Sequence, residues 1–285
     1  MSNLLEINNL SVDFPSRRGQ VAAVNKVSIS VAKGEVLGLV GESGAGKSTV
    51  GNSVINLLEP PGYISGGEII FDGTRIDKMY NEEMRKIRGA KIGTIFQDPQ
   101  TSLNPLMTIG KQLSETLIET LKISGSSALQ KSIELLESVG IPNPDQRLNA
   151  YPHQFSGGMR QRVVIALALA GDPDLVIADE PTTALDVSIQ KQILDLIKSL
   201  CKQRNLGVII VTHDIGVIAE IADRVAVMYN GQLVEEGKVR QVLQKPKHDY
   251  TKSLISAVPS GDQNLTASRL LTTLMAQKKK PLYQM

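Results

Sequence analysis

The segment that most constrains the fold of this chain is a glycine-rich stretch at residues 41–48, with the sequence GESGAGKS. It fits the pattern G-x-x-x-x-G-K-[ST] at every position, between an apolar run at residues 36–40 and a predicted helix from Lys47. In such a strand–loop–helix unit, glycines let backbone N–H groups approach phosphate oxygens, and the lysine reaches the β- and γ-phosphates. The positive end of the helix faces the same anion.

This stretch predicts that the chain binds a nucleoside triphosphate together with Mg²⁺, with the serine hydroxyl as a metal ligand. A glycine-rich turn without a ligand is the alternative, and the flanking strand and helix argue against it. The pattern alone does not distinguish one class of nucleotide enzyme from another. The predicted contacts are Gly41, Glu42, Ser43, Gly44, Ala45, Gly46, Lys47, Ser48 and Thr49, with Ser48 also on the metal.

Apolar runs and helical patterns alternate along much of the chain. Such alternation predicts a parallel sheet that is covered on both faces, with active sites beyond the carboxyl ends of its strands. Between residues 98 and 170 the pattern changes to three helical segments, at residues 106–121, 128–139 and 158–170, which predict a helical insert. Predicted strands are 4–12, 27–31, 36–40, 68–71, 93–96, 175–178, 207–211 and 224–228, and further helices are 47–58 and 187–203.

Two carboxylates, Asp179 and Glu180, follow directly on the apolar run at residues 175–178. Ionised groups are costly to desolvate, so a buried strand that ends in two of them suggests a chemical role. Asp179 fits the aspartate that holds the metal opposite the serine of the loop, and Glu180 can act as a general base toward water. The alternative is that both carboxylates are simply exposed where the strand meets a loop.

Composition excludes several classes of protein. With 285 residues and a 41% hydrophobic share, the chain can form one ordinary core with an inserted or appended smaller unit. The net charge of +2, with both signs interspersed, argues against nucleic acid as a partner. The one cysteine, Cys201, excludes an internal disulfide or cysteine-rich metal site and is expected to be buried. The basic run at residues 278–280 predicts a solvated tail rather than a lipid contact.

The first residues lack the charged and apolar regions of a signal peptide. Uncharged apolar runs stay well short of the ~18 residues that a membrane-spanning helix needs. We therefore expect a protein on the cytoplasmic side, whose membrane role, if any, comes through a partner.

One further motif, at residues 155–162 with the sequence FSGGMRQR, precedes a helix of small and apolar residues. Ser156, Gly157 and Gly158 can form a second anion site at the amino end of that helix. This motif resembles the signature of the ATP-binding-cassette (ABC) ATPases, in which it faces the nucleotide of another subunit. The common family form begins Leu-Ser-Gly-Gly-Gln, so Phe155 and Met159 depart from it.

The resemblance covers roughly residues 4–258 and assigns several further roles. Gln97 matches the glutamine that touches the metal or water and senses the membrane partner. His213 matches the switch histidine on the γ-phosphate, and Asp186, in the segment at residues 184–186, matches the loop that communicates across the dimer. Phe14 is the candidate for the aromatic that stacks on adenine, and a core residue is its alternative.

The resemblance also implies the architecture: an α/β fold with a P-loop NTPase (RecA-like) core, a mainly parallel sheet, an antiparallel β subdomain and a helical insert. We expect the ATP-binding core at residues 1–97 and 171–240, the helical subdomain at residues 98–170, and a C-terminal extension at residues 241–285. Cofactors would be ATP and Mg²⁺, with Glu180, His213 and Gln97 as catalytic residues and Ser48, Gln97 and Asp179 near the metal.

Within the family, the segments at residues 96–105, 151–162 and 178–187 resemble the oligopeptide, dipeptide and nickel importer ATPases. The segment at residues 247–251, KHDYT, resembles their His-Pro-Tyr-Thr motif, with Asp249 in place of proline. The single cysteine excludes the iron–sulfur site of some relatives. Met159 implies a heterodimer with a second ATPase paralogue, and a homodimer is the alternative.

Further implied partners are two transmembrane permease subunits and, indirectly, an extracytoplasmic solute-binding protein. The chain would sit peripherally on the cytoplasmic face of the inner membrane. Peptide is the expected cargo, while nickel, an opine or a short sugar remain open. An ABC ATPase acting on DNA or ribosomes is a rival, but the chain has neither long coiled coils nor a second cassette. A soluble P-loop kinase or GTPase is the other rival, and the chain shows no Asn-Lys-x-Asp guanine motif.

Overall fold

The computed structural model describes residues 3–16, 19–183 and 185–257. Two predictions involve residues outside these ranges. They concern Ala184 in the segment predicted to act across the dimer and the basic run at residues 278–280. Of the predicted C-terminal extension, only residues 241–257 are described.

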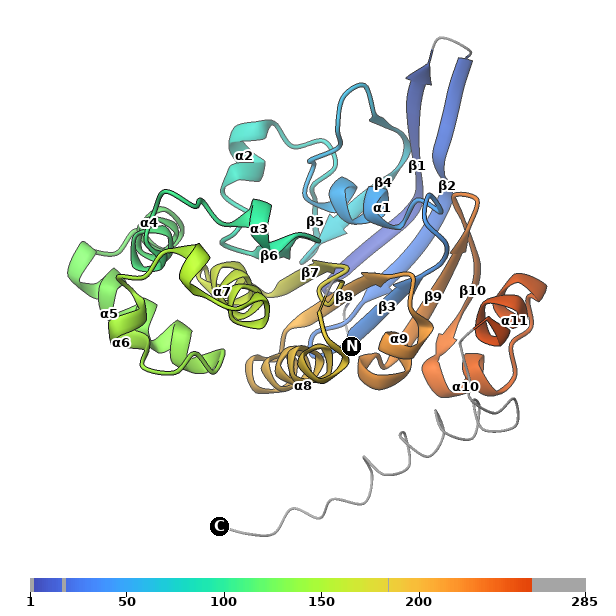
Figure 1. Cartoon of the computed structure of the whole chain (residues 1–285). Coiled ribbons are helices and arrows are strands. Elements are labelled where there is room, and N and C mark those ends of the chain that lie inside the picture. The colour runs from blue at the N-terminus through green and yellow to red at the C-terminus, as the bar shows by residue number, and fades with distance from the viewer. Residues whose placement is uncertain (1–2, 17–18, 184, 258–285) are drawn as a thin grey trace.

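A six-stranded sheet forms the centre of the molecule (Figure 1). The strands from β9 to β6 are parallel to their neighbours, whereas β10 at the edge is antiparallel to β9. All five residues of β3 are buried, which is why the sequence shows a continuous apolar run there. The strand order is β10 (Gln232–Lys238), β9 (Arg224–Tyr229), β3 (Val36–Val40), β8 (Gly207–Thr212), β7 (Leu175–Asp179) and β6 (Ile92–Ile95).

A second sheet of four antiparallel strands covers one face of the first. Side chains of alternate residues on the large sheet, such as Leu37, Leu39 and Ile209, share a buried core with this second sheet. The short helix α1 (Lys47–Val54) adds Val50 and Val54 to the same core. The strand order is β2 (Gly19–Val31), β1 (Leu5–Ser16), β4 (Tyr63–Phe71) and β5 (Thr74–Arg75).

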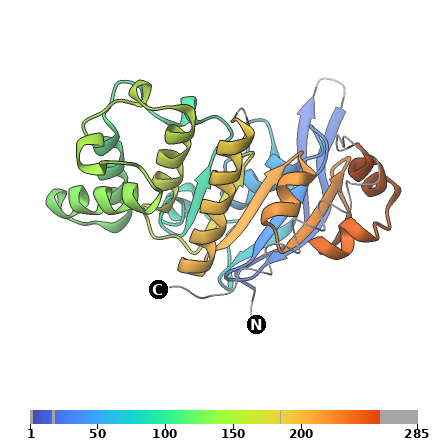
Figure 2. The same cartoon turned by 60° about the horizontal axis from the view of Figure 1, so that its bottom comes forward.

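Helices cover the opposite face of the large sheet, where Val36, Val208 and Ile210 point into a separate core. Figure 2 shows two of these helices, α8 and α9, lying across the strands. The prediction of a mainly parallel sheet covered on both faces is therefore confirmed. These helices are α8 (Val187–Arg204), α9 (Ile215–Ile221) and α10 (Val239–Gln244).

The helices between β6 and β7 lie together at one end of the molecule (Figure 1). The three predicted helices form, although the first begins at Ile109 rather than at residue 106. It begins there because the Thr108 hydroxyl accepts the Lys111 N–H and caps the first turn. The elements are α3 (Pro99–Ser102), α4 (Ile109–Leu121), α5 (Gly125–Ser138), α6 (Pro144–Arg147), a 3₁₀ turn (Pro152–Gln154) and α7 (Gly157–Leu169).

Several boundaries differ from the sequence prediction. Helix α1 ends at Val54 rather than at residue 58, because Asn56 is left-handed at φ 51° and two prolines follow. Strands β2 and β4 begin earlier than predicted because their mostly exposed first residues also pair with β1. Helix α9 lies between two predicted strands, where the alternating pattern indicates a helix, whereas β10, α2 (Asn81–Arg85), α10 and α11 (Asp249–Ser256) were not predicted.

A test of this packing concerns Gly93 in β6. A Cβ there would overlap the Ala168 carbonyl oxygen in α7, which is backbone and cannot rotate away. We expect Gly93→Ala to lower the free energy of unfolding by roughly 1–3 kcal/mol, as overpacked core substitutions do. Urea denaturation measures it. Gly125→Ala is the matched control, because a Cβ there meets no atom within 4 Å; equal midpoints for the two variants would contradict the packing.

Candidate functional site

The predicted site residues lie at one edge of the large sheet. The glycine-rich loop follows β3, Asp179 and Glu180 stand at the end of β7, His213 follows β8, and Gln97 lies just beyond β6. Because these strands are parallel neighbours, their carboxyl ends meet at the same edge (Figure 1). The topology therefore gathers groups that are far apart in the sequence.

The glycine-rich loop is wrapped tightly against its surroundings. Gly46 adopts φ 93°, and a Cβ there would overlap the Ala23 carbonyl oxygen of β2. A Cβ on Gly41 would overlap the Met228 carbonyl oxygen at the end of β9. Both positions therefore require glycine, and α1 begins immediately afterwards at Lys47.

The Lys47 side chain folds back into this loop. Its Nζ donates to the carbonyl oxygens of Gly41 and Glu42, each at 2.8 Å, and the residue is only 5% exposed. Burial lowers the pKa of Lys47, while the charges of Glu180 and Asp179 act in the opposite direction. An ammonium held by neutral carbonyls, with carboxylates nearby but not paired to it, can be shared with a bound anion.

Asp179 has an unsatisfied oxygen. The Ser48 hydroxyl hydrogen-bonds its carboxylate, yet Oδ1 is buried without a hydrogen-bond partner in the described part of the chain. Burial raises the pKa of Asp179, as does the charge of Glu180, although the Ser48 bond lowers it. A buried carboxylate oxygen beside a hydroxyl supplies the oxygen ligands that Mg²⁺ prefers.

Within the described residues, no group of three or more His, Cys, Asp or Glu side chains could hold a metal by itself. Mg²⁺ takes one or two carboxylates and completes its shell with water and substrate phosphates. Ser48 and Asp179 supply one hydroxyl and one carboxylate of this kind.

Glu180 contacts the other two predicted catalytic residues, His213 and Gln97. Its Oε1 lies 2.8 Å from His213 Nδ1, and its Oε2 accepts from Gln97 Nε2 at 3.0 Å. Thr183, which the sequence did not single out, donates its hydroxyl to the same Oε2 at 2.9 Å. The backbone of Glu180 is left-handed at φ 45°, where the chain leaves β7.

Burial raises the pKa of Glu180, but the hydrogen bonds from His213 and Thr183 and nearby positive charge outweigh it, so the pKa lies below its ordinary value. The carboxylate is therefore ionised at neutral pH. An ionised carboxylate that is held in place by three side chains can orient a water molecule.

Ser156, Gly157 and Gly158 form the start of α7, where the Ser156 hydroxyl accepts the Met159 N–H at 3.3 Å. A Cβ on Gly158 would lie 2.7 Å from Ile189 Cγ2 of α8, so the helix start packs on α8. Helix α7 contacts β6, and both β7 and β8 lie between β6 and the strand that carries the glycine-rich loop. The two predicted anion sites thus occupy different parts of one chain.

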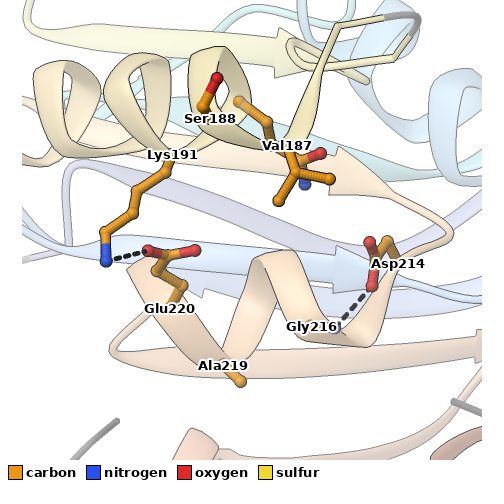
Figure 3. Close-up of a pocket in the computed structure, with 8 residues that line it drawn as sticks. Val187, Ser188, Lys191, Asp214, Gly216, Ala219 and Glu220 are labelled. Atoms are coloured by element: carbon orange, nitrogen blue, oxygen red, sulfur yellow. Dashed lines mark hydrogen bonds and ion pairs between the residues drawn. The ribbon is translucent and has the colours of Figure 1, made fainter. Parts of the chain in front are cut away.

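Two other predicted residues lie further from the loop. Phe14 is half-buried on β1, with its ring against Gly62, and β2 separates β1 from the loop. Asp186 is exposed at the start of α8 and makes no capping bond. The residues after Asp186 and His213 line a groove between α8 and α9, in which Val187 is 84% exposed (Figure 3).

Sequence reasoning also missed Tyr250 in α11. Its hydroxyl oxygen accepts the Glu42 N–H at 2.8 Å, so a helix near the end of the described chain touches the glycine-rich loop. The sequence signal was the KHDYT segment, which resembled a family motif without indicating any contact.

Comparison with known proteins agrees with this geometry. The sequence model described as ABC transporter matches residues 24–183, which include the loop, the start of α7 and the Asp179–Glu180 pair. This chain belongs to the ABC transporter family. A second model, described as oligopeptide/dipeptide transporter C-terminal region, matches residues 234–281. The chain is therefore a nucleotide-binding ABC ATPase.

Similar curated proteins include two from Bacillus subtilis (strain 168). The oligopeptide transport ATP-binding protein OppD is 51% identical, over 94% of this chain and 76% of the relative. The dipeptide transport ATP-binding protein DppD is 49% identical, over 93% of this chain and 79% of the relative.

Among solved structures, the dimeric structure of MJ0796, a bacterial ABC transporter cassette, superposes with a TM-score of 0.73 at 32% identity. The match covers 82% of this chain and 98% of the MJ0796 chain. The same cassette in a post-hydrolysis state bound to ADP and Pi matches with a TM-score of 0.73 at 31% identity. The predicted fold class and the ATPase activity are confirmed.

The unpartnered oxygen of Asp179 leads to a stability prediction. Asp179→Asn removes a desolvated charge, so in EDTA without nucleotide we expect the variant to be more stable than the wild type by on the order of 1 kcal/mol. Thermal unfolding measures the difference. Asp195→Asn, at an exposed position on α8, is the control and should change stability by less than about 0.5 kcal/mol. A less stable Asp179→Asn variant would show that the charge is well solvated.

Proposed function

We propose that this chain is the ATP-hydrolysing subunit of an importer for peptides, which couples hydrolysis to transport through membrane subunits. The observation that carries the chemistry is the Glu180 carboxylate, held by Gln97, Thr183 and His213 next to the glycine-rich loop. The curated relatives named as oligopeptide and dipeptide transport ATP-binding proteins support the class of cargo.

The glycine-rich loop would hold the phosphates of ATP through its backbone N–H groups and Lys47. Ser48 and Asp179, with Gln97 nearby, would hold the Mg²⁺, which neutralises phosphate charge when it is bound. Glu180 then orients the attacking water, while His213 fixes Glu180 and reaches toward the γ-phosphate. Catalysis of this kind rests on positioning and electrostatics rather than on covalent chemistry.

A second ATPase subunit completes each site in this proposal. The start of α7 packs on α8, where Gly158 lies against Ile189, and in this proposal it faces the nucleotide of a partner. Exposed Val187 and Asp186, beside the groove of Figure 3, would contact that partner near His213. A paralogue is the expected partner, and a second copy of this chain is the alternative.

The membrane subunits would bind a different groove, between β6, α7 and the segment that follows α1. Leu57 and Phe96 line it and are 44% and 46% exposed, and Phe96 directly precedes Gln97. A cytoplasmic helix of a permease subunit placed there would reach Glu180 through Gln97. No helix in the described part of the chain is long and apolar enough to cross a membrane. In this proposal the permease subunits hold the chain at the cytoplasmic face of the membrane.

The role of Glu180 is tested by Glu180→Gln in the assembled transporter. This variant keeps the shape of the side chain but loses its charge, so we expect kcat for ATP hydrolysis to fall by roughly 10²–10⁴-fold with little change in ATP affinity. Phosphate release and nucleotide binding measure the two quantities. Glu134→Gln, at an exposed position in α5, should leave both unchanged. Unaltered steady-state hydrolysis in Glu180→Gln would refute the proposed role.

Coupling and cargo are tested in vesicles that contain the membrane subunits and the binding protein. We expect short peptides to stimulate ATP hydrolysis and nickel ions to have no effect. Phe96→Ser should reduce this stimulation without weakening ATP binding, because it removes an apolar contact from the groove. Leu129→Ser, which changes a side chain of similar exposure (50%) on α5, is the control. Stimulation by nickel but not by peptide would show that the proposed cargo is wrong. Full coupling in Phe96→Ser would show that this groove does not couple hydrolysis to transport.

A further inference from the structure

Helix α11 reaches the phosphate loop through one side chain. The Tyr250 hydroxyl oxygen accepts the backbone N–H of Glu42 at 2.8 Å, across 208 positions of the sequence. The backbone carbonyl oxygen of Glu42 accepts a hydrogen bond from Lys47 Nζ at 2.8 Å. Glu42 is therefore held on one side by α11 and on the other by the lysine that would bind phosphate.

Tyr250 is itself held firmly. Glu235 on β10 accepts the backbone N–H groups of Lys247 and His248 at 2.9 and 3.0 Å, which fixes the chain as it enters α11. His248 Nδ1 then accepts the Tyr250 N–H at 3.2 Å and caps the helix. The Tyr250 ring stacks on Tyr229 with centroids 4.2 Å apart. These contacts leave the hydroxyl little freedom to move away from Glu42.

The turn after β9 supports the other end of the same loop. The Gly231 N–H donates to the Ala45 carbonyl at 3.2 Å, and the Met228 carbonyl packs against Gly41. Strands β9 and β10 and helix α11 therefore form a wall beside the loop. In Figure 1 this wall lies on the side of the molecule opposite the helices between β6 and β7. Tyr250 is the side chain by which α11 joins this wall.

We propose that Tyr250 is a positioning residue for nucleotide binding, which holds Glu42 so that the phosphate loop keeps its binding shape before ATP arrives. The inference rests on the proposed nucleotide site and gives α11 a function within it. A preformed loop loses less conformational freedom when it binds phosphate, so affinity rises. By thermodynamic linkage, ATP binding also stabilises the contact between Tyr250 and Glu42. The amides of α11 are therefore more protected from hydrogen exchange when ATP is bound.

The neutral phenol suits this role. Burial raises the pKa of Tyr250, so the hydroxyl stays protonated at physiological pH. The oxygen accepts from Glu42, and the hydroxyl proton remains available to a further acceptor.

Tyr250→Phe in the full chain tests the inference, because it removes the hydroxyl and keeps the stacked ring. One lost hydrogen bond to the loop should raise the Kd for Mg·ATP by roughly threefold to tenfold. In the assembled transporter, KM for ATP should rise while kcat stays near the wild-type value. Tyr229→Phe is the matched control, since it removes a hydroxyl from the same aromatic pair and leaves the Glu42 contact in place; its Kd should be unchanged.

Amide hydrogen exchange provides a readout that a purely structural role would not move. Exchange at Glu42 should be faster in Tyr250→Phe than in Tyr229→Phe at equal melting temperature. Exchange across residues 249–256 should slow when ATP is added to the wild type, and less so in Tyr250→Phe. His248→Ala, which removes the cap of α11, should weaken ATP binding in the same direction.

Lys47→Ala separates the two levels of inference. If the wild type binds ATP and Lys47→Ala does not, the nucleotide site stands. An unchanged Kd and unchanged Glu42 exchange in Tyr250→Phe would then overturn the role of Tyr250 alone. If Lys47→Ala binds ATP like the wild type, the proposed phosphate site itself is wrong.

Discussion

The structure depends on the parallel pairing of β3 with β8 on one side and β9 on the other. This pairing gives β3 a hydrogen-bonded neighbour on each edge and brings the carboxyl ends of neighbouring strands to one edge of the sheet. A parallel sheet needs a cover on each face, and the antiparallel sheet and the helices provide it with two separate cores. The site is a consequence of this arrangement, because each of its groups follows a strand that the pairing aligns.

The electrostatics of the site follow from partial burial. Lys47 and Asp179 lose hydration and are not fully compensated by neighbouring groups, which shifts the pKa of both toward the neutral form. Glu180 follows Asp179 directly in the sequence, but it accepts enough hydrogen bonds to remain a stable anion. Lys47 and Asp179, which would contact ATP and Mg²⁺, are thus destabilised in their charged forms. Glu180, which would orient water, is stabilised in its charged form.

Much of the fold was predictable from local patterns, and the failures have physical causes. The apolar run of β3 and the helical spacing of α4, α5 and α7 identified their elements, because fully buried strands and amphipathic helices leave clear patterns. The outer parts of β2 and β4 were missed because their residues are mostly exposed or half-buried and become strands by pairing with β1. Strand β10 was missed for a similar reason: its side chains are exposed or half-buried, and its pairing with β9 makes it a strand.

The sequence by itself determined the phosphate loop, because its function depends on contiguous backbone N–H groups and on a lysine at fixed spacing. It also placed Asp179 and Glu180 at a strand end. The tertiary structure decided what those groups touch. Gln97 and His213 meet Glu180 across 83 and 33 positions, and Tyr250 meets Glu42 across 208. Contacts over such separations are set by strand order and helix packing, which depend on the whole chain rather than on any one segment.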